Sequence, residues 1–462
     1  MDRAKLVGKR LLVMGLGRFG GGVDVVRFAV KGGAHVVVTD RATQEQLRGS
    51  VEQLRQLTDV AFHLGRHDPD DFLAADVVVA NPAVRSDNEF LQLARRSGKR
   101  VTSQIGLFFQ MCPAMIVGIT GANGKSTTAA LTAHLLEKAR PQTGRLGYER
   151  VWLSGNIGHR PLLASLDDIG AGDVVVLELS SFQLEQLAEI RAAPQVALLT
   201  NLTPNHLDRH GTFEAYCAAK ENIFRWQPRH AETPAVSVFN TEDAIGSRWL
   251  EAYREQPGRI CIGFSADDVG AAMREGFPLP GRANLSNLAG AMAIARQFGV
   301  EDPAVAEALP GFQALAHRLE SVGTVNGVRW YDDSIATTPQ SAIVALEAFE
   351  GPKIIIAGGY DKDLPFDELG ERIASRAKAA ILIGQTAGKI ADAIAASGSA
   401  DSKVRVTFAG SLEQAVSLAH QFAVAGDVVL LSPACASYDM FDNFQQRGRA
   451  FVELVRELGA GL

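Results

Sequence analysis

Short runs rich in Val, Ile, Leu and Ala alternate with longer segments of helical spacing from one end of the chain to the other. This alternation predicts parallel strands covered by helices, and therefore an α/β fold. The runs fall into three groups, so we expect three sheets. The predicted strands are residues 10–14, 36–39, 77–80, 115–120, 174–178, 196–200, 328–332, 353–357, 380–383, 404–408 and 428–432. Residues 43–75 and 228–275 yield no clear prediction.

The three groups of strands agree with the length of 462 residues, because one domain usually spans roughly 150 residues. A first domain limit is expected near Cys112–Pro113, just before a new strand. A second limit is expected near Pro310–Gly311, after a helix that follows the Pro- and Gly-marked residues 278–281. The predicted domains are residues 1–112, 113–312 and 313–462.

Composition and charge narrow the function classes. The formal net charge is −6 and the pI about 6.0, so no global basic field would draw the chain onto nucleic acid or an anionic bilayer. No apolar run approaches the roughly 20 residues of a membrane span, and the first residues lack an export signal. The four cysteines, Cys112, Cys217, Cys261 and Cys435, form no metal-binding or disulfide pattern. We expect a cytoplasmic protein without nucleic-acid or membrane partners.

The sharpest motif is Thr-Gly-Ala-Asn-Gly-Lys-Ser-Thr at residues 120–127, directly after a predicted strand and before a helical segment. Backbone N–H groups of such a turn, together with the positive end of the following helix, hold phosphate oxygens. The lysine reaches the terminal phosphates and the next hydroxyl binds Mg²⁺. The motif departs from the general P-loop because Ile119 occupies the place of the first glycine. It nevertheless predicts a nucleoside triphosphate site at Gly121, Ala122, Asn123, Gly124, Lys125, Ser126 and Thr127.

A second glycine motif, Gly15-Leu16-Gly17-Arg18-Phe19-Gly20, follows the first predicted strand, and Asp40 closes the next one. This spacing fits a dinucleotide fingerprint, in which the glycines approach a diphosphate and the acid approaches a ribose. An NAD-dependent dehydrogenase is therefore an alternative function. That alternative leaves the P-loop without a role, so we prefer a nucleotide-linked substrate at this motif.

The form of the P-loop, TGxNGK[ST], resembles that of the Mur ligases and the folylpolyglutamate synthases. Further segments extend the resemblance to the Mur ligases over nearly the full chain, and within them to the branch that adds glutamate. These segments are residues 201–211 (NLTPNHLDRHG) with Lys220, Glu178 at a strand end, residues 279–284 (LPGRAN), His317–Arg318, residues 331–334 (YDDS) and residues 431–448 (LSPACASYDMFDNFQQRG). The resemblance implies three α/β domains: a Rossmann-like N-terminal domain, a central P-loop domain and a Rossmann-like C-terminal domain.

The resemblance also implies roles in ATP and metal binding. ATP would be bound by the P-loop residues with Asn284, Arg318 and Asp333. Mg²⁺ would be held by Ser126, Glu178, His206 and Lys220. Lys220 would have to be carbamylated, because an ammonium group cannot ligate a cation; without the resemblance it would be a helical lysine that faces solvent. The implied catalytic set is Lys125, Glu178, His206 and Lys220.

The same resemblance implies sites for the two other substrates. The UDP-linked substrate would be bound by Gly15, Leu16, Gly17, Arg18, Phe19, Asp40, Arg41 and Asn156. Glutamate would be bound by Lys362, Thr337, Ser437 and Phe444. The implied reaction is the ATP-dependent ligation of D-glutamate to UDP-N-acetylmuramoyl-L-alanine through an acyl phosphate, in peptidoglycan precursor synthesis. The enzyme is expected to be a monomer with small-molecule substrates.

Two departures from the family pattern bear on this expectation. Ala283 stands where a histidine is common. Ile335 stands where a lysine normally contacts the glutamate site, and a branch that adds L-glutamate to the same nucleotide has a similar Asp-Ser-Ile-Ala-Thr-Thr-Pro run. The sequence therefore leaves the stereochemistry open, with D-glutamate preferred and L-glutamate as the alternative.

Overall fold

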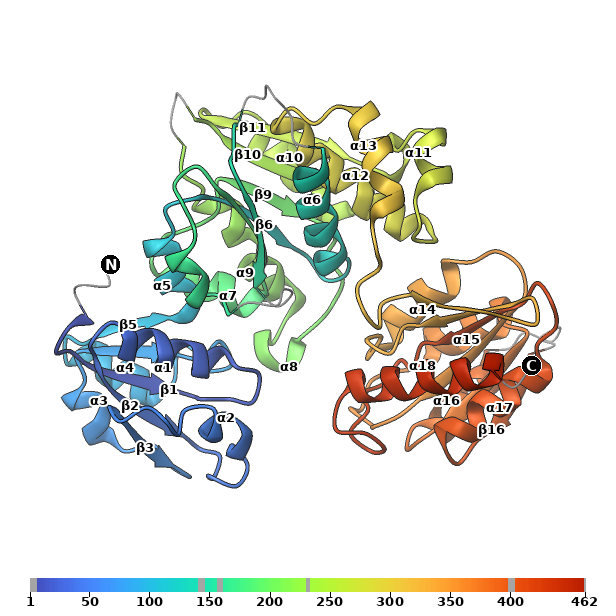
Figure 1. The fold of residues 1–462 in the computed structure, drawn as a ribbon, viewed down its shortest axis with the longest axis horizontal. Coiled ribbons are helices and arrows are strands. Elements are labelled where there is room, and N and C mark those ends of the chain that lie inside the picture. The colour runs from blue at the N-terminus through green and yellow to red at the C-terminus, as the bar shows by residue number, and fades with distance from the viewer. Residues whose placement is uncertain (1–5, 140–145, 156–160, 230–232, 398–403, 461–462) are drawn as a thin grey trace. The chain divides into compact units, whose positions relative to one another are not determined.

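The computed structural model describes residues 6–139, 146–155, 161–229, 233–397 and 404–460, which form three sheets with helices packed against them (Figure 1). The α/β class and the three sheets predicted from the sequence are confirmed. Within the described residues, every strand pairing is parallel except one in the third sheet.

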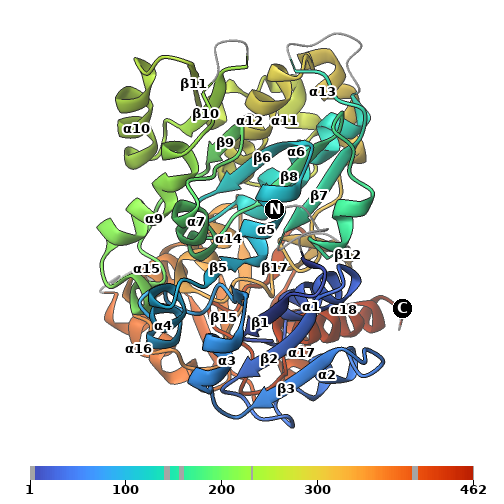
Figure 2. The ribbon, with the colours of Figure 1, turned by 90° about the vertical axis from the view of Figure 1, so that its left-hand side faces the viewer.

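The first sheet has the order β3 (Val60–Leu64), β2 (His35–Asp40), β1 (Arg10–Met14), β4 (Val77–Ala80) and β5 (Arg100–Ser103). Successive side chains of a strand point to opposite faces. Leu11 and Val13 therefore join a core with α1 (Gly21–Lys31) and α5 (Gln104–Met111). Leu12 and Met14 join another with α3 (Pro69–Ala74) and α4 (Glu89–Arg96). Figure 2 shows the adjacent strands β1, β2 and β3; the short α2 spans Arg48–Glu52.

The second sheet has the order β11 (Arg259–Phe264), β10 (Ala235–Asn240), β9 (Val196–Leu199), β6 (Met115–Thr120), β8 (Val174–Glu178) and β7 (Val151–Gly155). Helices α7 (Ser181–Glu189), α9 (Phe213–Arg225) and α10 (Ala244–Arg254) share a core with alternate residues of these strands. Helix α6 (Lys125–Lys138) packs against β6, β7 and β8. A Cβ on Gly290 of α12 (Arg282–Gln297) would lie 3.0 Å from a methyl carbon of Leu198, so this helix packs closely on the sheet.

The third sheet has the order β12 (Glu320–Val325), β13 (Val328–Asp332), β17 (Val428–Leu431), β14 (Lys353–Gly358), β15 (Ala379–Ile383) and β16 (Arg405–Phe408). One core joins it to α14 (Pro339–Glu347), α15 (Asp367–Arg376) and α16 (Ala387–Ala396). The other core joins it to α17 (Leu412–Phe422) and α18 (Phe444–Ala460). The antiparallel pair β12–β13 turns at Asn326 and Gly327, whose φ angles of 51° and 78° suit a two-residue hairpin.

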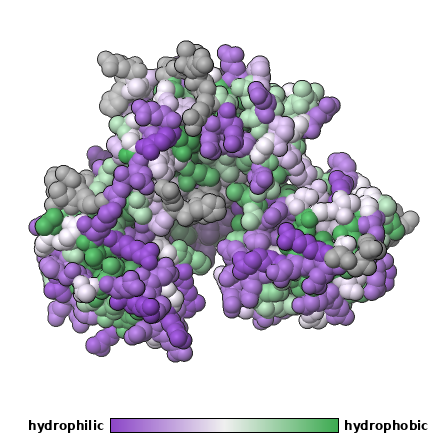
Figure 3. Space-filling model, viewed as in Figure 1, coloured by the Kyte–Doolittle hydropathy of each residue, from purple (hydrophilic) through white to green (hydrophobic). Residues whose placement is uncertain are grey.

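The chain divides into two compact units, Met1–Ser265 with Ala289–Val305 and Ala266–Leu288 with Ala306–Leu462. The first unit contains the first two sheets and the second unit contains the third. The remaining short helices are α8 (Leu207–His210), α11 (Ala271–Gly276) and α13 (Asp302–Ala308). On the face shown in Figure 3, hydrophilic residues predominate over α18, whose opposite side places Phe451 and Val455 in the core. None of the helices described has the length and apolar character that crossing a membrane requires.

Candidate active site

The P-loop has the strand, turn and helix predicted from the sequence. It begins where β6 ends at Thr120 and leads into α6 at Lys125. Gly121 has a φ of 150°, and a Cβ there would lie 1.9 Å from the Thr200 hydroxyl oxygen. Gly124, with a φ of 81°, caps α6 in the left-handed conformation. Only glycine fits at position 121, and the left-handed backbone at position 124 favours glycine. The turn leaves backbone N–H groups at the start of a helix, as phosphate binding requires.

Asn201 holds the P-loop against the end of β9, a role that the sequence did not indicate. Its side-chain oxygen accepts a hydrogen bond from the Asn123 N–H (2.9 Å), and its side-chain nitrogen donates to the Asn123 carbonyl (3.2 Å). Its backbone carbonyl accepts from the Ala122 N–H (2.8 Å). The Thr200 hydroxyl adds a bond to the Asn123 carbonyl (2.6 Å). These bonds fix the conformation of the loop before a nucleotide binds.

Ser126 and Glu178 meet beside the loop. Glu178 is the last residue of β8, which pairs with β6, so its carboxylate lies next to the first turn of α6. The Ser126 hydroxyl donates a hydrogen bond to Glu178 Oε2 at 2.6 Å, and both residues are buried. A hydroxyl and a carboxylate at the phosphate end of a P-loop are oxygen donors that suit Mg²⁺. The pair therefore fits the predicted metal site.

Lys220 does not face solvent, so the alternative reading of this residue is wrong. It is a buried residue of α9, and its ammonium nitrogen donates to Thr120 Oγ1 (3.0 Å) and to the Gly121 carbonyl (2.9 Å). Burial, helped by the positive charge of Lys125, lowers the pKa of Lys220 well below its usual value, although Glu178 acts in the opposite direction. This environment favours the neutral amine, which is the form that reacts with carbon dioxide to give a carbamate.

His206 precedes α8 with a left-handed backbone, at a φ of 53°. Its ring lies 5.2 Å from that of Phe182, edge to face. Desolvation by the surrounding protein and the positive charges of Lys220 and Lys125 lower the pKa of His206, against the opposing charge of Asp208. A neutral imidazole is the form that ligates a metal. His206 therefore joins Lys125, Glu178 and Lys220 in one electrostatic neighbourhood.

Four of the predicted UDP-binding residues line a cavity of about 530 Å³ at the carboxyl ends of β1, β2 and β4. Gly15, Gly17, Asp40 and Arg41 line it, with His67, Asn81, Arg85 and others that the sequence did not indicate. The Gly17 N–H donates to Asp40 Oδ2 (3.3 Å), which ties the glycine loop to the end of β2.

The other predicted UDP-binding residues lie differently. Leu16 has a buried side chain, so only its backbone can meet a ligand. Phe19 is 98% exposed at the tip of the glycine loop, and Arg18 is exposed beside it. Asn156 lies outside the described residues.

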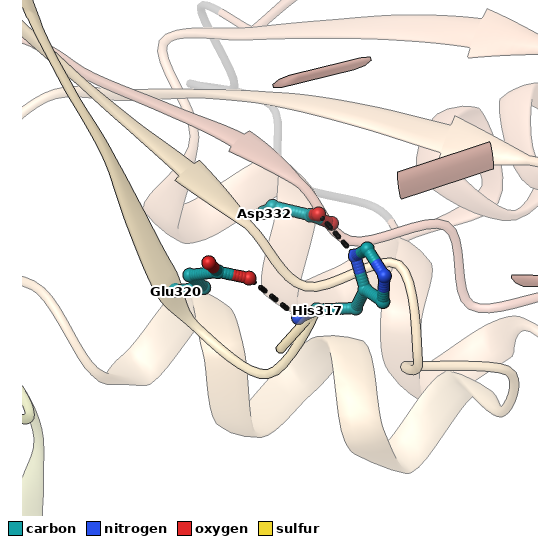
Figure 4. Close-up of side chains that lie close together, drawn as sticks. All are labelled: His317, Glu320 and Asp332. Carbon is teal, nitrogen blue, oxygen red and sulfur yellow. Dashed lines mark hydrogen bonds and ion pairs between the residues drawn. The ribbon is translucent and has the colours of Figure 1, made fainter. Parts of the chain in front are cut away.

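In the second compact unit, Asp332 ends β13, Asp333 follows it, and both are buried. Burial raises the pKa of Asp333 to about 7, although the Ser432 hydroxyl, Arg318 and the Leu319 N–H act to lower it. Figure 4 shows the neighbouring ring of His317 directed at Asp332, with its Nδ1 2.7 Å from Asp332 Oδ2. The His317 backbone N–H donates to Glu320 (2.8 Å).

These contacts surround two of the predicted ATP-binding residues. They fix the left-handed turn at His317, where φ is 62°, next to Arg318. The third predicted residue of this unit, Asn284, donates to the Pro280 carbonyl (2.7 Å) near the start of α12.

Three predicted glutamate-binding residues follow strands of the third sheet. Ser437 is buried after β17, and its hydroxyl has no hydrogen-bond partner among the described residues. Lys362 is exposed two residues after Tyr360, which pairs with Ala436. Thr337 lies half-buried after β13. A buried hydroxyl without a partner is a candidate ligand contact.

The fourth predicted residue, Phe444, begins α18. Its carbonyl accepts a bond from the Ser334 hydroxyl (2.8 Å), which also accepts one from Arg447 (3.0 Å). These contacts join the start of α18 to the end of β13.

The whole chain is similar to known ligases. Residues 9–103 match the Mur ligase MurD-like N-terminal domain, residues 119–295 the Mur ligase middle domain and residues 317–435 the Mur ligase glutamate ligase domain. A UDP-N-acetylmuramoylalanine--D-glutamate ligase of Roseiflexus sp. is 39% identical over 98% of this chain and 99% of its own length. A ligase of the same name from Acetivibrio thermocellus is 36% identical over 99% of this chain and 98% of its own.

Solved structures show the same fold at low sequence identity. MurF from Acinetobacter baumannii aligns with a TM-score of 0.56 and 15% identity, over 98% of this chain and 92% of its own. A pseudomurein peptide ligase type C from Methanothermus fervidus aligns with a TM-score of 0.53 and 14% identity, over 98% of this chain and all of its own. These likenesses concern the arrangement of the elements and not the chemistry.

Proposed function

The chain belongs to the Mur ligase family, and from that premise we propose that it uses ATP to join D-glutamate to UDP-N-acetylmuramoyl-L-alanine, in peptidoglycan precursor synthesis. The observation that carries the proposal is the cluster of Ser126, Glu178 and buried Lys220 around a preformed P-loop. A non-catalytic nucleotide-binding protein has no need for this cluster. A dehydrogenase has no use for it either.

The P-loop residues act first in the proposed mechanism. The N–H groups from Gly121 to Thr127 and the Lys125 ammonium hold the phosphates of ATP. The alanine carboxylate of the nucleotide substrate attacks the γ-phosphorus of ATP. The bond between this phosphorus and ADP breaks, and an acyl phosphate forms. Positive charge and aligned N–H groups stabilise the charge on the transferred phosphoryl group, which is where phosphoryl transfer gains most of its rate.

Mg²⁺ is the second proposed ligand of this site, supported by the Ser126–Glu178 pair. Ser126, Glu178, His206 and carbamylated Lys220 would hold it, and a bound Mg²⁺ supplies charge neutralisation for the phosphates. Carbamylation turns a donor-only amine into an anion with two oxygens, while the lowered pKa of Lys220 keeps the amine reactive. The carbamate forms as the amine nitrogen attacks carbon dioxide and loses a proton.

Carbamylation of Lys220 predicts a specific pattern of loss and rescue. Lys220→Ala should lose most turnover, and millimolar acetate or propionate should restore part of it by supplying the missing carboxylate. Lys99→Ala is the matched control, because Lys99 is not part of the cluster. Acetate that leaves Lys220→Ala inactive while ATP still binds would argue against a carbamate.

The second half-reaction is assigned to residues of the third sheet. The glutamate amine attacks the acyl carbon, phosphate leaves and the nitrogen loses a proton. Ser437, whose hydroxyl has no partner in the part of the chain that the structure describes, supports a contact with the incoming glutamate. Lys362, Thr337 and Phe444 are proposed as its other contacts. Asn284, Arg318 and Asp333 are proposed to contact ATP, and the UDP group is assigned to the cavity at Gly15 and Gly17.

The remaining proposals concern the whole protein. We propose that limits near residues 112 and 312 separate the three modules along the sequence. We place the enzyme in the cytoplasm, where its nucleotide substrates would occur, and we propose that it acts as a monomer. Sedimentation equilibrium of the purified chain tests the last point, and a dimer would contradict it.

The decisive test is phosphate release with UDP-N-acetylmuramoyl-L-alanine, ATP and Mg²⁺, with D-glutamate and L-glutamate in parallel. Turnover with D-glutamate is expected. Turnover with L-glutamate alone would assign the chain to the branch that adds L-glutamate. Ile335 is the residue that favours this alternative. Turnover with neither would overturn the ligase proposal, and tight NADH binding would then favour a dehydrogenase.

A further inference from the structure

The third sheet has three loops at the carboxyl ends of neighbouring strands. Residues 359–363 follow β14, residues 384–386 follow β15 and residues 432–439 follow β17. The first loop contains Lys362 and the third contains Ser437, both of which are proposed contacts of glutamate. The loop after β15 has no role in that proposal or in any motif of the sequence.

Thr386, in the loop after β15, has a hydroxyl that does not serve the adjoining helix. A threonine directly before a helix commonly accepts a hydrogen bond from an N–H group of the first turn. Thr386 is the N-cap of α16, yet no N–H group in the described first turn of this helix donates to its hydroxyl. The side chain is fully buried, so the hydroxyl needs partners elsewhere in the fold.

The partners of this hydroxyl lie in the other two loops. The Gly359 N–H donates to Thr386 Oγ1 (3.1 Å), and the Thr386 N–H and hydroxyl donate to the Gly359 carbonyl (3.1 Å and 3.2 Å). Cys435 Sγ lies 3.2 Å from the same hydroxyl oxygen, and either atom can be the donor. One buried side chain therefore joins the loop after β14, three residues before Lys362, to the loop after β17, two residues before Ser437.

The neighbours of Thr386 in its loop are fitted just as closely. A Cβ on Gly384 would lie 2.8 Å from the Cα of Gly359, so no larger residue fits there. The Gln385 side-chain oxygen accepts a hydrogen bond from the Asp361 N–H (3.3 Å), and the Gln385 N–H donates to Asp439 Oδ2 (3.1 Å). These contacts leave the loops after β14 and β17 little freedom to move apart.

We propose that Thr386 is a positioning residue that sets the length of the amino-acid side chain accepted by the site. By holding Gly359 and Cys435 to one hydroxyl, it fixes the separation of the backbones that carry Lys362 and Ser437. A fixed separation suits a carboxylate at one distance from the reacting amine. Aspartate is shorter by one methylene, so it cannot reach both these contacts and the acyl phosphate. The inference rests on the proposed function, which assigns Lys362 and Ser437 to glutamate.

The test compares glutamate with aspartate of the same configuration, as kcat/KM from phosphate release by the full-length chain with ATP, Mg²⁺ and UDP-N-acetylmuramoyl-L-alanine at saturation. The wild type is expected to prefer glutamate by roughly a hundredfold or more. Thr386→Val keeps the shape of the side chain but removes the hydroxyl, so this preference should fall about tenfold. Thr386→Ser keeps the hydroxyl and should keep the preference. Thr324→Val, on the edge strand β12, is the matched control and should also keep it.

A second variant separates positioning from stability. Gln385 is exposed, so Gln385→Ala loosens the loop that carries Lys362 without opening a gap in the core. It should lower the preference for glutamate by a smaller factor than Thr386→Val. Urea unfolding establishes which variants are folded. A general loss of stability would lower turnover with both amino acids equally and leave their ratio intact.

The ratio of the two kcat/KM values decides the outcome. An unchanged ratio in folded Thr386→Val would overturn the inference, as would a wild type that uses aspartate as well as glutamate. If Thr386→Val does not fold, an unchanged ratio in Gln385→Ala overturns it instead. A wild type that turns over neither enantiomer of glutamate would overturn the proposed function, and the inference with it.

Discussion

At the scale of single residues, the candidate ligand contacts of each compact unit include polar groups that are buried at a cost to stability. Lys220, Asp333 and Ser437 each have little exposure. Burial of a charged or unpartnered polar group is unfavourable unless partners compensate it. Each of the three was also singled out from the sequence as a ligand contact. Polar groups whose burial lowers stability are expected at positions where a chain needs them for binding.

The carboxyl of Asp333 should make the stability of the free protein depend on pH. Its pKa is about 7 in the folded chain, against an ordinary value of 3.8. Between these values the folded chain holds a proton that the unfolded chain has released, so the free energy of unfolding falls as pH rises and levels off above pH 7. Asp333→Asn should remove this decline and stabilise the protein at pH 8 by up to about 4 kcal/mol.

Urea unfolding at pH 5 and pH 8 measures this difference. The exposed Asp392→Asn on α16 is the control and should leave the pH dependence unchanged. The prediction is wrong if Asp333→Asn changes the free energy of unfolding equally at both pH values. Under the proposed function, the same substitution should also weaken ATP binding, so stability and affinity would move in opposite directions.

The Ser437 hydroxyl should contribute to glutamate binding and not to the stability of the fold. It has no partner among the described residues, so Ser437→Ala removes an unsatisfied group and should leave the free energy of unfolding unchanged or raise it by about 1 kcal/mol. If the hydroxyl contacts glutamate, the KM for glutamate should rise about tenfold while the KM for ATP stays the same. Steady-state phosphate release tests both values. The exposed Ser417→Ala is the control, and a variant with unchanged KM for glutamate would remove Ser437 from the site.

At the scale of elements, the sequence predicted interior strands better than edge strands. The strands that it did not indicate are β3, β5, β7, β10, β11 and β12, and all but β10 lie at the edge of a sheet. An edge strand is covered on fewer sides, so it lacks a continuous apolar run; β3 alternates between half-buried and exposed residues. In β10 the buried Ser237, which donates to Gln227 (2.6 Å), interrupts the apolar pattern. The Asn326-Gly327 pair was a hairpin signal that could have revealed β12.

The site was predictable where a motif has a fixed local geometry. The P-loop turn and the strand-end position of Glu178 follow from residues that are close in sequence or end a strong strand. Asn201 and His67 could not be found in this way, because their contacts depend on how β9 lies beside β6 and how β3 lies beside β2. For Asn201 the available signal was an asparagine shortly after a buried strand, whereas His67 follows a strand that the sequence did not indicate.

The bonds between Asn201 and the P-loop should preorganise this element. Asn201→Ala removes the two side-chain bonds to Asn123, so the loop should sample more conformations before ATP binds. We expect about a tenfold loss of affinity for ATP and a loss of roughly 1–3 kcal/mol in unfolding free energy. Calorimetry with an ATP analogue and urea unfolding measure the two effects.

A variant with a negative charge at the same position serves as the comparison for Asn201→Ala. Asn201→Asp keeps an acceptor for the Asn123 N–H but places a negative charge next to the phosphate site. It should lose less stability than the alanine variant and more ATP affinity. Equal ATP affinity in the wild type and both variants would show that the loop needs no support from β9.

At the scale of the whole molecule, the chain passes between its two compact units more than once. Residues Ala266–Leu288 belong with the third sheet although they precede Ala289–Val305, which belong with the second. Gly281 shows how closely this segment packs, because a Cβ there would lie 2.6 Å from the Cα of Ala348. The ligand contacts proposed for Asn284 and Arg318 therefore come from the same unit, although the limit near residue 312 would separate them.

This arrangement predicts that a fragment of residues 1–312 will not fold as an independent protein. Met273, Phe277 and Leu279 are each 8% exposed in the full chain, and they belong to the same compact unit as residues 313–462, which the fragment lacks. We expect the fragment to bind an apolar fluorescent dye more strongly than the full chain and to be cut first by trypsin at Arg274 or Arg282. Changing the three apolar residues to serine in the fragment should reduce dye binding, because their exposed surface causes it. A fragment that binds no more dye than the full chain and resists trypsin at both arginines would instead establish the limit near residue 312 as a true domain boundary.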